Sequence, residues 1–309
     1  MKLESMKFSP GGKNRKWITW GILFAFWVFG LGLVGWLMWE SRNEIIELFR
    51  HGDYSKLLGA FLFYLGALVA VIVGWVEIMQ GFAPKINWWK HVQIYCATLA
   101  ARRLPGTLWY VGGRVVLYKK LGVSGTAMSI ASSIELVISV VTGGLIGLIL
   151  IPLRYELPIH ILILLWGIVI IGFVLVQPKI LKSISKRIND IGINIQIKNL
   201  VIWLVSYTFM WVMGGWMLVQ IINVFQVVHS GDLVLIIGAW ALSGAAGILT
   251  LFLPSSFGMT EVALTILLSQ ILPLPLAGTV SIITRLLSIF FEFLVAIIFF
   301  PIVRRSLNV

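Results

Sequence analysis

Two apolar regions of the chain are interrupted by proline and glycine, and they carry the same kinds of charge in opposite order. The first region holds residues 102–106 (RRLPG) and 112–114 (GGR), with Glu135 following. The second holds residues 253–258 (LPSSFG) and Glu261, with Arg285 following. A charged side chain at the middle of a bilayer costs ~2.5–3.5 kcal/mol even on lenient scales, so charges retained there need a partner or a use. Interrupted helices at corresponding positions of two halves indicate a transport site between repeats.

Composition supports lipid as the main solvent of this chain. Hydrophobic residues make up 59% of its 309 residues and charged residues only 12%. A soluble core cannot bury that much apolar surface. The single cysteine, Cys96, excludes an intramolecular disulfide, and the four histidines are scattered without metal-binding spacing. The sequence also lacks phosphate-loop, nucleotide-binding and nucleophile motifs, so we expect no metal, no cofactor and no enzyme activity.

Six segments are long enough to cross a bilayer of ~30 Å, which needs ~20 residues each. They are residues 17–39, 57–82, 124–152, 158–177, 199–226 and 275–301. The first is too long for the core of a cleaved signal peptide and is expected to be an uncleaved span. The broken regions, 92–118 and 232–272, are each expected to form two half-helices around a buried turn. Residues 232–252 alone would also be long enough to span.

The distribution of basic residues predicts the topology. With a cytoplasmic N-terminus and re-entrant broken regions, the cytoplasmic segments hold sixteen Lys and Arg residues and the outer loops hold four. The cytoplasmic segments are then 1–16, 83–91, 119–123, 178–198 and 302–309. The net charge of +12 is thus explained by membrane orientation, and we expect no nucleic-acid partner. Both termini are expected on the cytoplasmic side of a cell membrane.

This topology makes the two halves an inverted repeat. The first broken region enters from the cytoplasm and the second from outside, so the spans that follow, 124–152 and 275–301, run in opposite directions. The sequence therefore predicts an all-α, polytopic membrane protein with about six full spans and two broken, re-entrant helical hairpins. A basic N-terminal segment, 1–16, precedes a single transmembrane domain at 17–305.

Eight charged residues are expected at membrane depth, four acidic and four basic. They are Glu77, Arg102, Arg103, Arg114, Glu135, Glu261, Arg285 and Glu292. Arginine has a planar fork that suits a phosphate. We expect Arg114 and Arg285 to neutralise a phosphate, and Glu135 and Glu261 to hold those arginines when the site is empty. The alternative is that these charges form purely structural ion pairs.

Other site residues follow from their positions. Arg103 and Glu292 are added to the substrate-binding set, and Glu292 is expected to have a different partner from Arg285 because ~10 Å of helix separates them. Glu77 lies near the end of its span, where it could reach the interface. The expected turns or hinges are Pro105, Gly106, Gly113, Pro254 and Gly258.

Two further patterns each allow two interpretations. Small residues lie near the charges, among them the GxxxG spacing of Gly143 and Gly147. They predict close helix packing, or alternatively a hinge or cavity wall. Residues 178–198 form a basic amphipathic segment that would lie on an anionic membrane surface, or else a solvated loop.

At these residues the chain resembles the transmembrane region of lysylphosphatidylglycerol synthases and their stand-alone relatives, the flippase-like domain proteins. The resemblance rests on 104–106 (LPG), 113–114 (GR), Glu135, Pro254, Gly258, Glu261 and 285–286 (RL), and it covers roughly residues 15–305. The second motif departs from the family at 255–257 (SSF), where relatives are often richer in glycine. The membrane domain of that family is thought to translocate lipids, while a separate soluble domain of the synthases attaches an amino acid to phosphatidylglycerol.

The resemblance implies lipid translocation and argues against synthase activity for this chain. The cargo would be an anionic phospholipid or a lipid linked to polyprenyl phosphate, and a glycosyltransferase or lipid synthase is a possible partner. Two other functions stay open. One is an integral-membrane enzyme acting on a lipid phosphate, and the other is a membrane scaffold for a glycosyltransferase.

Overall fold

The computed structural model describes residues 42–103, 109–156, 158–177, 179–180, 183, 197–249 and 258–307, and every regular element in these ranges is helical. The longer helices are α3 (Lys56–Phe82), α6 (Gly125–Leu150), α7 (Ile159–Leu175), α9 (Ile197–Phe225), α10 (Leu233–Leu249) and α12 (Leu274–Ser306). The shorter ones are α2 (Arg42–His51), α4 (Trp88–Thr98), α5 (Trp109–Lys119) and α11 (Met259–Leu268). Three 3-10 turns are η1 (Leu99–Arg103), η2 (Ile151–Leu153) and η3 (Ser230–Asp232).

Five helical segments of the described part are long and apolar enough to cross a membrane. They are Lys56–Phe82, Gly125–Leu153, Lys198–Phe225, Ser230–Leu249 and Leu274–Ser306. The protein is therefore all-helical in its described part, and it has the length and composition of a multi-pass membrane protein. Four of these segments coincide with predicted spans. The predicted span 158–177 forms α7, whose 17 residues are near the lower limit for crossing, and 17–39 lies outside the described residues.

Each broken region forms two helical pieces, as the sequence predicted. The first consists of α4, extended by η1, and of α5. The second consists of α10 and α11. The turns between them, with Pro105, Gly106 and Pro254, lie outside the described residues. Gly258 directly precedes α11 and has a φ of 89°, a left-handed conformation that favours glycine because it has no Cβ.

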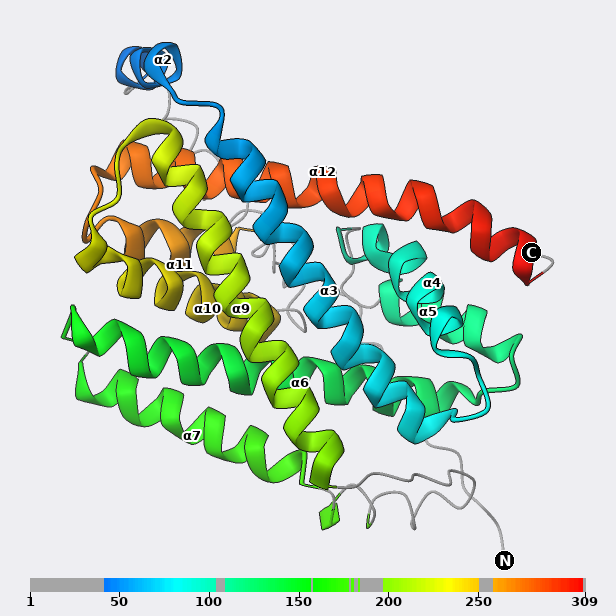
Figure 1. Cartoon of the computed structure of the whole chain (residues 1–309). Helices are drawn as coiled ribbons and strands as arrows, with labels where there is room; N and C mark the ends of the chain where they lie inside the picture. The colour runs from blue at the N-terminus through cyan, green and yellow to red at the C-terminus, as the bar shows by residue number, and fades with distance from the viewer. Residues whose placement is uncertain are drawn as a thin grey trace, which may run out of the picture.

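Helices α3 and α9 pack along each other and cross the middle of the molecule diagonally in Figure 1. Helix α6 lies on one side of them and α12 on the other, with α4 and α5 at one end and α10 and α11 at the other (Figure 1). Helix α6 packs on both α5 and α10, while α12 packs on both α11 and α4. Helices α6 and α12 thus each contact pieces of both broken regions.

Glycines allow α10 to approach its neighbours closely. A Cβ added at Gly143 would lie 2.9 Å from the carbonyl oxygen of Ala241, and one at Gly147 would lie 2.7 Å from the Cβ of Leu242. The GxxxG spacing on α6 is therefore a packing surface for α10, which is the first of the two interpretations.

Capping residues explain where two of these helices begin. The Ser124 side chain accepts a hydrogen bond from the Ala127 backbone N–H at the start of α6. The Asn87 side chain does the same for Trp89 at the start of α4. Each bond satisfies one backbone donor that the first turn of a helix leaves unpaired.

The structure describes the predicted extramembrane segments only in part. Residues 40–56, expected as an outer loop, contain the amphipathic helix α2, which packs on α9 and α12. The basic segment 178–198 lies almost entirely outside the described residues, as does the N-terminal segment 1–16.

Candidate functional site

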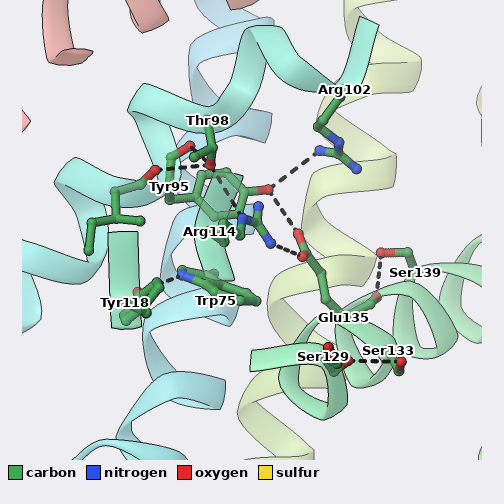
Figure 2. Close-up of polar contacts among 11 residues, drawn as sticks. Trp75, Tyr95, Thr98, Arg102, Arg114, Tyr118, Ser129, Ser133, Glu135 and Ser139 are labelled. Carbon is green, nitrogen blue, oxygen red and sulfur yellow. Dashed lines mark hydrogen bonds and ion pairs between the residues drawn. The ribbon is translucent and has the colours of Figure 1, made fainter. Parts of the chain in front are cut away.

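Arg114 of α5 and Glu135 of α6 form an ion pair inside the protein. Their side chains are 0% and 1% exposed, and Arg114 Nη1 donates to Glu135 Oε2 (Figure 2). The pair holds the second half of the first broken region against the helix that follows it. A buried charge without its partner is strongly destabilising, so this contact fixes α5 on α6.

Three aromatic rings enclose the Arg114 guanidinium. Its Cζ atom lies 4.0 Å from the ring centroid of Trp75, 4.4 Å from that of Tyr95 and 5.0 Å from that of Tyr110. Figure 2 shows Trp75 and Tyr95 against the guanidinium. Cation–π attraction is strongest where water is excluded, as it is here. This aromatic cage could not be predicted from the sequence, because its residues come from α3, α4 and α5 and share no spacing.

Hydrogen bonds extend the pair to Arg102 of η1. The Tyr95 hydroxyl donates to Glu135 Oε1 at 3.1 Å and accepts from Arg102 Nη1 at 3.5 Å (Figure 2). Arg114 Nε donates to Thr98 Oγ1 at 3.4 Å. Tyr95 therefore links the enclosed ion pair to a second arginine, Arg102.

A second ion pair occupies the other broken region. Arg285 Nη1 of α12 lies 2.8 Å from Glu261 Oε1 of α11, and the two side chains are 24% and 19% exposed. They line a cavity of about 50 Å³ with Trp240, Ser281 and other residues of α10, α11 and α12. The other carboxylate oxygen of Glu261, Oε2, is buried without a hydrogen-bond partner. This pair, unlike the first, borders open space.

A larger cavity of about 130 Å³ lies where η1, α3, α9, α10 and α12 meet. Its charged lining residues are Arg102 and Glu292, and we call it the central cavity. Both cavity volumes exceed the ~10–15 Å³ that one water molecule requires. A cavity lined by one arginine and one carboxylate can accept a small anion if the carboxylate moves away from the arginine.

The structure brings four of the predicted site residues into two pairs, Arg114 with Glu135 and Arg285 with Glu261. Glu292 lines the central cavity together with Arg102. Arg102 was predicted to lie at membrane depth but was not included in the predicted substrate-binding set. Arg103 ends η1, and its side chain lies outside the described part.

Two other predicted residues line neither of these cavities. Gly113 lies on α5 beside Thr98, and Glu77 is half-buried on α3. In the described ranges no three His, Cys, Asp or Glu side chains gather as metal ligands would. The full enclosure of Arg114 is the main difference from expectation, because no ligand can touch it in this conformation.

No family model matches the chain, and no curated protein matches it. The resemblance to the flippase-like domain therefore stays a prediction.

Proposed function

We propose that this protein moves a phosphate-bearing lipid between the two leaflets of a membrane, with Arg285 as the group that binds the phosphate. The observation that carries the proposal is the Glu261–Arg285 pair, which lies on two helices of the transmembrane region and borders a cavity. An arginine held by a carboxylate is neutral as a unit and can stay at membrane depth. A phosphate that replaces the carboxylate gains bidentate hydrogen bonds from the guanidinium.

Exchange of partners supplies the free energy for a conformational change. A ligand shifts an equilibrium only by its difference in affinity for the two states. When the headgroup phosphate binds Arg285, Glu261 loses its partner and the ion pair between α11 and α12 is broken. The second broken region would then rearrange, and release of the lipid would restore the pair.

The proposal includes an inverted repeat of α3–α6 and α9–α12. In this repeat α4 corresponds to α10 and α6 corresponds to α12. Helix contacts support it, because α6 packs on α10 and the corresponding pair, α12 and α4, is also in contact. The contacts of α5 with α6 and of α11 with α12 correspond in the same way. In such a repeat the enclosed pair, Arg114–Glu135, corresponds to the more accessible pair, Glu261–Arg285. Arg114 would reach a phosphate only in the opposite state of the transporter.

We place both termini on the cytoplasmic side of a cell membrane. The loop after α3, the loop before α6 and the end of α12 all contribute to one hydrophobic cluster, since Ala83 and Val303 are buried in it and Leu121 packs against it. Lysines and arginines gather in these segments: Lys85, Lys90, Lys119, Lys120, Arg304 and Arg305. A concentration of basic residues at one end of a bundle favours the cytoplasmic side.

The test is translocation of headgroup-labelled lipids in proteoliposomes, with mass spectrometry of the lipids afterwards. Phosphatidylglycerol, a zwitterionic phospholipid and a polyprenyl phosphate are compared. We expect one phosphate lipid to move with unchanged mass, and Arg285→Gln to slow it at least tenfold. Arg50→Gln, which breaks an exposed ion pair with Glu47, is the matched control and keeps the wild-type rate.

A charge exchange separates binding from structural pairing. Arg285→Glu combined with Glu261→Arg restores an ion pair but places the guanidinium on the other helix. We expect the combined variant to fold and to remain slow in transport. Full transport by this variant would mean that the pair is only structural and that Arg285 does not bind the phosphate. A changed headgroup mass would instead identify an enzyme.

A further inference from the structure

One face of α12 carries a line of polar residues through the membrane region. Ser281, Arg285, Ser288 and Glu292 recur at helical spacing, and together they span about 16 Å of the helix at 1.5 Å per residue. Ser288 lies between Arg285 and Glu292, three residues after the first and four before the second. Its hydroxyl donates a hydrogen bond to the Thr284 backbone carbonyl, so the lone pairs of its Oγ atom point away from the helix backbone.

The two cavities lie in series along this face. The smaller one holds Glu261 and Arg285, and the larger one holds Arg102 and Glu292. Trp240 of α10 and Ser288 belong to the walls of both. The indole of Trp240 and the Ser288 side chain therefore stand where the two spaces adjoin.

Gly214 of α9 gives the Trp240 indole its position. A Cβ added at Gly214 would lie 2.1 Å from the indole Nε1 atom, so only glycine leaves room for the ring there. The indole is thus held against α9 on one side and borders both cavities on the other. A large, rigid ring in this position limits what can pass from one cavity to the other.

We propose that Arg102 and Glu292 form a second binding station for the phosphate of the lipid, and that Trp240 is the partition between this station and Arg285. The inference rests on the proposed lipid translocation. Because Glu292 lines the same cavity, Arg102 has an opposite charge near it when the station is empty, as membrane depth requires. A phosphate arriving from Arg285 would replace this carboxylate on the second guanidinium.

The second station also connects the two halves of the protein. Arg102 donates to the Tyr95 hydroxyl, which donates to Glu135 of the enclosed pair. A phosphate that draws Arg102 away would weaken the support of Glu135 by Tyr95. Occupancy of the central cavity is thereby transmitted to the contact of α5 with α6, the pair that must open in the opposite state.

Cysteine labelling tests the partition without any transport assay. Cys96 is buried and is the only cysteine, so Cys96→Ala gives a background into which Ser288→Cys is introduced as a reporter. A small anionic thiosulfonate reagent then measures access to the cavity wall. Because Ser288 lies with Trp240 where the two cavities adjoin, we expect slow labelling when the indole fills this junction and at least tenfold faster labelling in Trp240→Ala. Ser306→Cys, at the exposed end of α12, is labelled at the same rate in both.

A comparison of reagent charge tests the station itself. Arg102→Gln should slow labelling of Ser288→Cys by the anionic reagent at least fivefold, while a cationic reagent of similar size reacts as fast or faster. A residue that only shapes the cavity would change both rates alike. Arg50→Gln is the control and alters neither rate.

The outcomes separate this inference from the proposed function. Unchanged labelling in Trp240→Ala, or equal effects of Arg102→Gln on both reagents, would overturn the partition and the station even if lipid transport is normal. Absence of lipid movement in the wild-type protein would overturn the proposed function without affecting the labelling results. Trp240→Leu replaces Trp240→Ala if the latter does not fold, as judged by its melting temperature.

Discussion

Glu135 and Arg285 carry opposite charges at matching places, each on the long helix that follows a broken region and each bound to the half-helix before it. Glu135 of α6 holds Arg114 of α5, and Arg285 of α12 holds Glu261 of α11. Each pair is neutral as a unit at a depth where an isolated charge is expensive. The two pairs differ in access, because the first is enclosed by aromatic rings and the second borders a cavity.

This difference predicts unequal costs for breaking the two pairs. Arg114→Gln leaves Glu135 buried without its cation, which should cost about 3–5 kcal/mol of stability. Arg285→Gln should cost clearly less, because the Glu261 side chain is partly exposed and borders a cavity. Thermal unfolding in detergent measures both, with Arg50→Gln as the exposed control. Equal melting temperatures for the Arg114 and Arg50 variants would show that the enclosed pair contributes nothing.

The Tyr95 hydroxyl provides a second prediction. Tyr95→Phe keeps the ring against Arg114 but removes the donor to Glu135 and the acceptor for Arg102. Loss of a buried hydrogen bond to a charged group should cost about 1.5–3 kcal/mol. The matched control is Tyr155→Phe at an exposed position, which should be neutral in the same unfolding measurement. A neutral Tyr95→Phe would mean that the ring alone supports the arginines.

Glycine packing between α6 and α10 gives a third prediction. Gly143→Ala would place a methyl group 2.9 Å from the Ala241 carbonyl and from the Trp211 ring, so α6 and α10 must separate. Overpacking of this kind should cost about 1–3 kcal/mol. Gly167→Ala on α7 meets nothing within 4 Å and should be neutral or stabilising by about 0.5–1 kcal/mol. Comparable melting temperatures for the two variants would contradict the packing role.

Much of the helical plan was predictable from the sequence, because long apolar runs must be helical in lipid and prolines mark the breaks. The predicted spans that became α3, α6, α9 and α12 follow from this, as does the division of each broken region. The pairing of Arg114 with Glu135 and of Arg285 with Glu261 was predictable from charge balance.

The aromatic cage, the central cavity and the position of Arg102 in that cavity were not predictable from the sequence. Trp75, Tyr95 and Tyr110 come together only because α3, α4 and α5 converge on one guanidinium. Arg102 and Glu292 are 190 positions apart and share a cavity through tertiary packing alone. The helix α2 was missed because a short amphipathic segment between apolar spans resembles a polar loop.

The turn at Gly258 gives the last prediction. Its φ of 89° costs a residue with a Cβ about 1–2 kcal/mol, so Gly258→Ala should strain the start of α11, where Glu261 lies. Gly258→Asn should be milder than Gly258→Ala, because asparagine tolerates the left-handed region. Gly112→Ala, within α5 and with nothing within 4 Å of the added methyl group, is the helical control. Unfolding temperatures and lipid transport are measured for all three. If strain at this turn misplaces Glu261, transport is slower in Gly258→Ala than in Gly258→Asn, and Gly112→Ala keeps the wild-type rate. Alanine tolerated as well as asparagine would show that the left-handed turn does not position the site.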